Sequence, residues 1–452
     1  MRPFTLRDAL KAVNGRYYGD EALLDCSVTG VSSDSRTVGE GTLFVAFKGA
    51  RVDGHSFMAD CLKRGAVCCL SERAPAGAAE MPCIVTPSSL TAMGALSAWY
   101  RSGFDIPVVG ITGSVGKTTS KEMVYAVLNR RFRTHKTQKN FNNELGVPWT
   151  LLAMPAEAQA AVVEMGISDF GEMTRLSAMV RPDIALITTI GDSHLEFLHD
   201  REGVLRAKTE IFSHMADGTL AIFNGDDALL RNYAAPVRRI SYGLGEWNDF
   251  VAADVENLAG DGMRMKIRHH GSCFSVEIPA FGAHMVYAAL AGAAVGWALG
   301  MSDAEIAEGI ADYETVGNRA KLIRTDRLTI LSDCYNANPN STASAIDSLC
   351  TLPGRRVCIL GDMLELGENT VQLHRSTGEK AAQAGISLVL ACGPLAKHIY
   401  EGARSGGCEA MYFETKAQLL AEMDVLIRPG DAVLVKASHS MAFEEFVEKL
   451  EK

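Results

Sequence analysis

Short apolar runs alternate with amphipathic stretches over most of the chain beyond residue 86. In the amphipathic stretches, apolar residues recur every three or four positions, as they do along one face of a helix. The apolar runs are VVGIT, AAVVEMG, DIALITTI, LTILSD, RRVCILGD, LVLACG and DAVLVKAS. Strands that alternate with helices form βαβ units, which build parallel sheets. The sequence therefore predicts an α/β fold with two largely parallel sheets.

Two changes in composition divide the chain into three predicted domains. Residues 74–80, APAGAAE, are small and turn-rich, and ETVGNRAKLI near residue 315 separates an Ala-rich helix from a new series of strands. A chain of 452 residues also exceeds one ordinary core, since domains usually hold about 100 to 200 residues. We predict a small α+β module over 1–86, a central α/β domain over 87–315 and a Rossmann-like α/β domain over 316–452.

Composition excludes several classes of function. No apolar run approaches the ~18 residues of a membrane span, and the start of the chain reads as an amphipathic helix rather than a signal peptide. A formal charge of -10 argues against nucleic acid as a partner. The 11 cysteines show no C-x-x-C spacing, which favours reduced thiols over metal or disulfide roles. We expect a cytoplasmic, monomeric protein.

Residues 110–128, GITGSVGKTTSKEMVYAVL, predict a strand, a glycine-rich turn and a helix. Such a turn points backbone N–H groups and a helix N-terminus at an anion, which makes the central domain a P-loop, ATPase-like domain. Lys117 would reach the β- and γ-phosphates, and the Thr118 hydroxyl would ligate Mg²⁺. The strict G-x-x-x-x-G-K-[ST] pattern fails once, because Ile111 replaces its first glycine. The predicted nucleotide contacts are Gly113, Ser114, Gly116, Lys117, Thr118 and Thr119.

Three further side chains predict a Mg²⁺ site beside this loop. Glu164 ends one buried strand and His194 follows the next, at the sheet edge where open α/β folds bind ligands. Lys208 falls on the apolar stripe of the helix EGVLRAKTEIFSHM. Burial favours the neutral amine, which can capture CO₂. Solvated loop positions for Glu164 and His194, and a snorkelling Lys208, are the structural alternatives.

The spacing G-x-T-G-[ST]-x-G-K-T-T around Lys117 resembles the phosphate loop of the Mur ligase superfamily, ATP-dependent enzymes that join amino acids or peptides to a carboxylate. In this resemblance Lys208 matches a lysine that the family carbamylates to help hold a second Mg²⁺. Arg319 matches an arginine that approaches the ATP phosphates from the last domain, and Asp333 a residue near the ribose. The resemblance implies ATP and two Mg²⁺ ions as cofactors. The implied metal ligands are Thr118, Glu164, His194 and Lys208, and the implied catalytic groups are Lys117, Lys208, His194 and Arg319.

Longer stretches resemble the family members that handle the peptidoglycan precursor. SSDSRTVGEGTLFVAFKGARVDGHSF is similar to their UDP-binding module, while TQKNFNNELGVPWTLL, LSDCYNANPNS and ILGDMLELG resemble the members that add a dipeptide. The implied reaction adds D-alanyl-D-alanine to UDP-N-acetylmuramoyl-tripeptide through an acyl phosphate. The implied substrate contacts are Ser35, Arg36, Lys48, Asp53 and His55 for the nucleotide sugar, Asn140, Asn142 and Asn143 in the central domain, and Tyr335, Asn336, Asn338 and Ser341 in the last domain.

Alternative functions stay open at this point. One alternative is a sibling ligase that adds a single amino acid; the member that adds the third residue should carry a D-N-P-R motif, which is absent. A folylpolyglutamate-type ligase should lack the SSDSR-type first domain. A non-catalytic nucleotide-binding switch would also need a P-loop.

The chain departs from the family pattern at four positions. Met285 and Ala288 stand where the family carries asparagines, one of them near adenine. Ser193 replaces a common alanine and His439 a common arginine. We expect neither Ser193 nor His439 to touch the core chemistry, although His439 could alter dipeptide docking.

Overall fold

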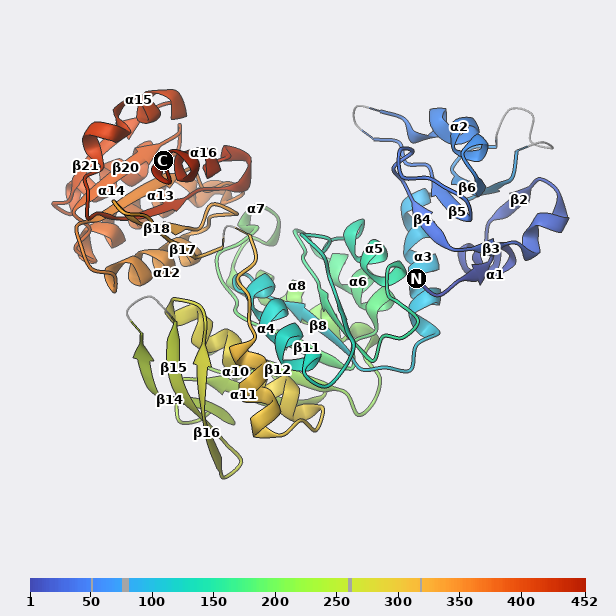
Figure 1. Ribbon diagram of the computed structural model, residues 1–452, viewed down its shortest axis with the longest axis horizontal. Helices are drawn as coiled ribbons and strands as arrows, with labels where there is room; N and C mark the ends of the chain where they lie inside the picture. The colour runs from blue at the N-terminus through green and yellow to red at the C-terminus, as the bar shows by residue number, and fades with distance from the viewer. Residues whose placement is uncertain (50–51, 75–80, 259–261, 318) are drawn as a thin grey trace.

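The computed structural model describes residues 1–49, 52–74, 81–258, 262–317 and 319–452. Figure 1 shows three bodies, with the blue N-terminal body and the red C-terminal body on either side of the central one. Each body has its own main β-sheet, mostly parallel in the two larger bodies, which confirms the predicted fold class. The turn-rich segment 75–80 lies outside the described residues, and the domain boundaries after 86 and 315 stay predictions.

The N-terminal body is a small sheet in the order β2-β7-β6-β5-β4, with β2 antiparallel to β7 and the other pairs parallel. Strands β1 and β3 form a separate two-stranded antiparallel sheet. The strands are β1 Phe4–Thr5, β2 Arg16–Tyr18, β3 Ser27–Val28, β4 Gly30–Ser32, β5 Thr42–Val45, β6 Ala66–Ser71 and β7 Cys83–Val85. The helices are α1 Leu6–Val13, η1 Glu21–Asp25, η2 Gly54–Phe57 and α2 Met58–Lys63.

Helix α3, Ser89–Ser102, joins the N-terminal body to the central one (Figure 1). Its Tyr100 is fully buried, and the Tyr100 hydroxyl donates a 2.7 Å hydrogen bond to the carbonyl of Met154 in the central body. The Phe4 ring packs edge-on against Trp99 and Tyr100 of the same helix. One apolar cluster therefore runs through both bodies.

The central sheet has nine strands in the order β16-β15-β14-β13-β12-β11-β8-β10-β9. Its strands are β8 Val108–Thr112, β9 Thr134–Lys136, β10 Ala160–Glu164, β11 Ile184–Ile187, β12 Leu220–Asn224, β13 Arg238–Gly243, β14 Phe250–Asn257, β15 Met263–His269 and β16 Ser272–Ile278. Its helices are α4 Lys117–Asn129, α5 Gly146–Leu152, α6 Glu172–Val180, α7 Leu195–Leu198, α8 Arg201–Thr209, η3 Glu210–His214, α9 Ala228–Asn232, α10 Ala283–Ala298 and α11 Asp303–Ala311.

Helices cover both faces of the parallel part of this sheet. Val108 packs in the cluster with α3, α5 and α6, whereas Val109 and Ile111 of the same strand pack in the cluster with α4, α10 and α11. A strand buried on both faces reads as a continuous apolar run, which is how β8, β10 and β11 appear in the sequence. The chain leaves β8 for β9 and β10 on one side and returns to β11 on the other, so a ligand crevice is expected at the carboxyl end of β8.

The C-terminal sheet has six strands in the order β17-β18-β22-β19-β20-β21, all parallel except β17. Its strands are β17 Lys321–Arg324, β18 Thr329–Ser332, β19 Arg356–Gly361, β20 Leu388–Cys392, β21 Glu409–Phe413 and β22 Ala432–Lys436. Its helices are α12 Pro339–Cys350, η4 Gly367–Asn369, α13 Thr370–Gln383, α14 Lys397–Ser405, α15 Lys416–Leu426, η5 His439–Met441 and α16 Glu444–Leu450. Across the described part of the chain, no helix has the length and apolarity to cross a bilayer.

Candidate active site

The glycine-rich turn forms as predicted between the end of β8 and the start of α4. Gly113 and Gly116 have φ values of 147° and 84°, which side chains rarely adopt. A Cβ atom on Gly113 would lie 1.9 Å from the Thr188 hydroxyl oxygen, so a side chain at this position would clash. Backbone N–H of Ser114 donates to the carbonyl of Thr189 at 2.9 Å, which fixes the turn against the end of β11.

Lys117 begins α4 and folds back over this turn. Its Nζ donates a 2.7 Å hydrogen bond to the carbonyl of Gly113. Burial lowers the pKa of Lys117, the Glu164 carboxylate raises it, and Arg319 from the C-terminal body lowers it. The ammonium therefore lies where charges from two bodies converge.

The Glu164 carboxylate ends β10 and is almost fully buried. Its Oε2 accepts a 2.9 Å hydrogen bond from the Thr118 hydroxyl, and its Oε1 accepts one of 2.8 Å from the amide nitrogen of Asn142. The backbone N–H of Glu164 donates to the Thr137 hydroxyl at 3.0 Å. Thr118 and Asn142, predicted separately, thus both donate to the predicted Glu164 carboxylate.

Lys121 is a buried charge beside this carboxylate that the sequence analysis did not identify. One turn beyond Lys117, its side chain is 1% exposed, and its Nζ lies 3.0 Å from Glu122 and 3.8 Å from Oε2 of Glu164. It also donates to the Thr137 carbonyl at 2.9 Å, and Glu122 pairs with Lys136 as well. The spacing of four residues from Lys117 was a signal, because such residues share one helix face.

Lys208 and His194 form the other side of the site. Lys208 is 1% exposed on α8, as predicted, and burial together with the Lys117 charge holds its pKa well below the ordinary value. Burial, Lys208 and Lys117 lower the pKa of His194 to about 4, so its imidazole is neutral near pH 7. Its Nδ1 lies 2.9 Å from a Glu365 oxygen without hydrogen-bond geometry and has no hydrogen-bond partner among the described residues.

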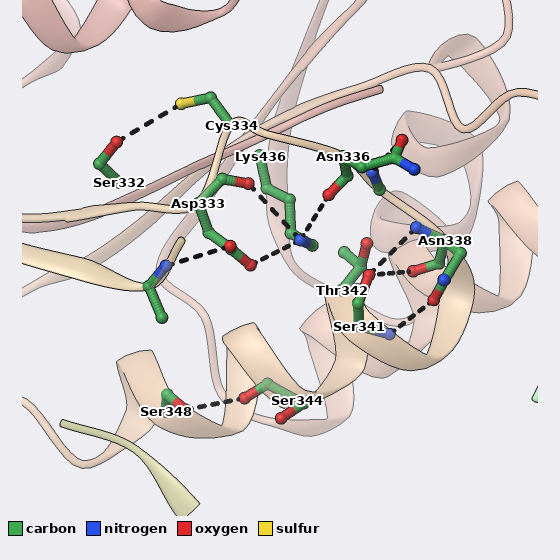
Figure 2. Close-up of polar contacts among 12 residues, drawn as sticks. Ser332, Asp333, Cys334, Asn336, Asn338, Ser341, Thr342, Ser344, Ser348 and Lys436 are labelled. Atoms are coloured by element: carbon green, nitrogen blue, oxygen red, sulfur yellow. Dashed lines mark hydrogen bonds and ion pairs between the residues drawn. The ribbon is translucent and has the colours of Figure 1, made fainter. Parts of the chain in front are cut away.

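The C-terminal body supplies the opposite wall of the site, and Figure 2 shows the polar contacts around Asp333 on that wall. Asp333 follows β18, and its Oδ1 accepts a 3.1 Å hydrogen bond from the N–H of Ala320. The Arg319 guanidinium carbon lies 3.8 Å from the centre of the Tyr335 ring, within cation–π range. Asn338 caps α12 through a 2.8 Å bond from the N–H of Ser341 to its side-chain oxygen, so this pair also shapes the local fold.

One cavity of about 420 Å³ lies between the two bodies and brings most predicted residues together. The predicted residues that line it are Ser114, Gly116, Lys117, Thr118, Thr119, Asn140, Asn142, Asn143, Glu164, His194, Arg319, Asp333, Tyr335, Asn336, Asn338 and Ser341. Gly113 and Lys208 are not among the lining residues. His284 and Lys436 also line the cavity and were not predicted.

The five predicted contacts of the nucleotide sugar are in the N-terminal body and do not line this cavity. Arg36 pairs with Asp34 at 2.7 Å on the surface. The His55 Nδ1 lies 2.6 Å from the Asp53 carboxylate. The backbones of Lys48 and Asp53 pair in an isolated antiparallel β-bridge. The carbonyl of Ser35 accepts from Arg64 at 3.1 Å. Ser35 and Arg36 follow β4 in the chain, whereas Lys48, Asp53 and His55 follow β5.

The four departures from the family pattern now have positions. Met285 and Ala288 are 2% exposed in the apolar core around α10, one residue and four residues beyond the cavity-lining His284. The Ser193 hydroxyl donates a 3.0 Å hydrogen bond to that of Ser114, so Ser193 contacts the phosphate loop, and the expectation that it does not touch the core chemistry stays a prediction. The His439 ring packs against Tyr335 at 5.2 Å between centroids.

The residues beside the loop suit Mg²⁺ better than a softer metal. Thr118 and Glu164 present oxygen atoms, and Mg²⁺ prefers one or two carboxylate ligands together with phosphate oxygens. Within the described ranges, no three His, Cys, Asp or Glu side chains gather as a metal site, so the protein alone does not form a complete cage. His194 has an Nδ1 atom without a hydrogen-bond partner among the described residues, and the Lys208 amine is buried. These two groups are the remaining predicted metal ligands.

Comparison with known proteins supports the resemblance to the Mur ligases. Family models match residues 27–100 as the Mur ligase catalytic domain, 111–296 as the Mur ligase middle domain and 318–439 as the glutamate ligase domain. A UDP-N-acetylmuramoyl-tripeptide--D-alanyl-D-alanine ligase from Bacillus subtilis is 37% identical over 94% of this chain and 93% of its own length. The chain belongs to the Mur ligase family.

Solved structures of Mur ligases share its three-body arrangement. A crystal structure of MurF from Acinetobacter baumannii aligns with a TM-score of 0.93 and 31% identity, over 100% of this chain and 99% of that one. MurF from Thermotoga maritima, solved in complex with ADP, aligns with a TM-score of 0.85 and 28% identity, over 94% and 97% of the two chains. The predicted family and the predicted ligase class are confirmed.

Proposed function

We propose that this protein uses ATP to add D-alanyl-D-alanine to UDP-N-acetylmuramoyl-tripeptide. The observation that carries the proposal is the shared cavity, in which the phosphate loop of the central body faces Arg319 and the asparagine-rich segment of the C-terminal body. A nucleotide-binding switch would not need a second wall of amide and hydroxyl groups. The names of the relatives supply the substrate pair.

The first step activates a carboxylate. The terminal carboxylate of the tripeptide attacks the γ-phosphorus in line, a new P–O bond forms, and the bond to the β–γ bridging oxygen breaks to release ADP. Negative charge spreads over the phosphoryl oxygens in the transition state. Lys117 and Arg319 line opposite walls of the cavity, and their cationic groups would stabilise this charge.

The second step forms the amide. The neutral amine of D-alanyl-D-alanine attacks the acyl carbon of the acyl phosphate, and inorganic phosphate leaves with the electrons of the C–O bond. Tyr335, Asn336, Asn338 and Ser341 lie on the wall where we place the dipeptide, and Asn140 and Asn143 on the wall of the tripeptide. The acyl phosphate hydrolyses readily, so enclosure between two bodies serves to exclude water.

Mg²⁺ would be held by Thr118 and Glu164, with His194 and a carbamylated Lys208 on the side of a second ion. The metal neutralises phosphate charge when it is bound. The chain contributes a buried amine whose protonated form is disfavoured by burial and by Lys117. Reaction of the neutral Lys208 amine with CO₂ would form an N–C bond and release a proton. The resulting carbamate anion would attract the Lys117 ammonium, which repels a protonated Lys208.

The UDP group would bind in the N-terminal body at Ser35, Arg36, Lys48, Asp53 and His55. The substrate is then extended, with its nucleotide on one body and its peptide carboxylate at the phosphate loop. The predicted cytoplasmic location and monomeric state belong to the same proposal.

The test is phosphate release from ATP and Mg²⁺ with UDP-N-acetylmuramoyl-tripeptide, with and without D-alanyl-D-alanine. We expect release only with both peptides, a product heavier by the dipeptide, and no turnover by Lys117→Ala with its fold intact. Rapid release without the dipeptide, or turnover with a single amino acid in its place, would refute the assigned substrate pair. Normal activity of Lys117→Ala would refute the assigned phosphate site.

A further inference from the structure

Lys436 is a buried lysine on the cavity wall to which the proposed reaction assigns no role. It is the last residue of β22, at the carboxyl edge of the C-terminal sheet, and its side chain is 2% exposed. A lysine is rarely buried to this degree without partners, because its ammonium loses hydration. Its partners therefore indicate what it does.

The Lys436 ammonium holds both ends of one short segment (Figure 2). Its Nζ donates to Oδ2 of Asp333 at 2.5 Å and to the carbonyl of Asn336 at 2.8 Å. Tyr335 lies between these two residues in the chain. Lys436 thus fixes the loop that presents the Tyr335 ring.

The same contacts extend to Arg319. The second carboxylate oxygen of Asp333, Oδ1, accepts the N–H of Ala320, the residue directly after Arg319. The Arg319 guanidinium lies over the Tyr335 ring at 3.8 Å. Both supports of Arg319, one through the backbone and one through the ring, depend on the segment that Lys436 holds.

We propose that Lys436 is a positioning residue that holds Arg319 at the phosphate loop. This inference rests on the proposed function, in which Arg319 stabilises the transferring phosphoryl group. Lys436 acts through Asp333 and Tyr335, so it influences phosphoryl transfer without a contact to the nucleotide sugar. Misplacement by about 1 Å can cost about 100-fold in rate, so we expect Lys436→Met to lower kcat by about 10- to 100-fold.

The experiment is a double-mutant cycle between Lys436→Met and Arg319→Lys, with kcat and the KM of each substrate measured. We expect the KM of UDP-N-acetylmuramoyl-tripeptide to stay within about twofold, since its nucleotide end is bound by another body. If Lys436 works through Arg319, Lys436→Met should lower kcat far less in the Arg319→Lys background than alone. Losses that multiply in the double variant would overturn the proposal.

Arg355→Met is the control for loss of an ion pair at the same strand, in which the carboxylate is buried and the arginine partly buried. Arg355 pairs with Asp431 at 2.7 Å. Asp431 directly precedes β22, so this pair lies at the opposite end of the strand from Lys436. Its replacement should lower the melting temperature and leave kcat unchanged. Equal losses of kcat in Arg355→Met and Lys436→Met would also overturn the proposal, because both would then report stability alone.

A second variant and a second readout cover the cases in which Lys436→Met does not fold or the proposed substrates fail. If Lys436→Met does not fold, Lys436→Arg takes its place in the cycle, because it keeps a charge and donors but changes their positions. If the wild type does not turn over the two peptides, the proposed substrates fail, and the cycle is repeated with the dissociation constant of ATP as its readout. Non-additive losses of ATP affinity would then support the role of Lys436, and additive losses would overturn it.

Discussion

The Thr118 hydroxyl donates a 2.9 Å hydrogen bond to Oε2 of Glu164, which links the first turn of α4 to the last residue of β10. Both residues lie at the carboxyl edge of the central sheet beside the phosphate loop. Their oxygens are hard ligands of the kind that Mg²⁺ prefers, so this pair is where a Mg²⁺–nucleotide complex would dock. Loss of the hydroxyl or the carboxylate should therefore change the Mg²⁺ dependence of activity more than it changes the melting temperature.

Thr118→Val tests this pair, because it removes the hydroxyl and keeps the branched shape. We expect the Mg²⁺ concentration for half-maximal activity to rise by about 10-fold or more, as for losses around metal ligands. Mg²⁺-dependent binding of a non-hydrolysable ATP analogue should shift in parallel, while the melting temperature without metal changes little. An unchanged Mg²⁺ dependence in both assays would rule out a metal ligand at Thr118.

Lys208→Ala tests the proposed carbamate. The variant should lose activity, because the shortened side chain cannot supply the anion, and a short carboxylic acid added to the buffer should restore part of it. The wild type should show a mass increase of one CO₂ under conditions that preserve the carbamate. Lys208→Arg, which cannot be carbamylated and fills the space, is the control that should not be rescued.

No rescue of Lys208→Ala together with an unmodified wild-type mass would leave Lys208 as a buried amine with a structural role.

Lys121→Met tests the buried charges beneath the site. The change leaves the Glu164 and Glu122 carboxylates without their shared ammonium, and breaking a buried pair commonly costs about 3 to 5 kcal/mol. Because Lys136 still pairs with Glu122, we expect the lower end of that range from denaturant unfolding. Arg130→Met, at the C-cap of the same helix, removes pairs with Glu308 and Asp312 that are largely exposed, and should destabilise the protein much less than Lys121→Met. Equal losses would contradict the buried network.

Strand ends were the part of the site that could be predicted from the sequence. Glu164, His194 and Asp333 follow apolar runs, and parallel strands place such residues at one edge of a sheet. Lys436 has the same signal, since it ends the run AVLVK, but its partner Asp333 lies 103 residues earlier in the chain. Pairing across that separation depends on the sheet order, in which β22 inserts between β18 and β19, and local pattern does not specify it.

The antiparallel ribbon β14-β15-β16 was missed for a different reason. Residues of β15 alternate buried and exposed along the whole strand, and His270–Gly271 forms a tight turn to β16, which is a period-two pattern. The charged residues Arg264, Lys266 and Arg268 alternate with the apolar residues of β15, so this strand lacks the continuous apolar run that marks the buried parallel strands. The predicted parallel core was right. Its antiparallel extension follows the two-residue period of a half-exposed strand instead.

His194→Gln tests the neutral imidazole through the pH dependence of stability. Burial, Lys208 and Lys117 lower the pKa of His194 from 6.5 to about 4, so the unfolded chain binds this proton at a higher pH than the folded chain. Protonation therefore favours unfolding as the pH falls from 6.5, and the loss is complete below about 4. Relative to His194→Gln, the wild type should lose up to about 3 kcal/mol of unfolding free energy across this window and show no pH-dependent difference above it. Urea unfolding of both proteins at a series of pH values measures this difference, and a constant offset throughout would mean that His194 titrates as an exposed histidine.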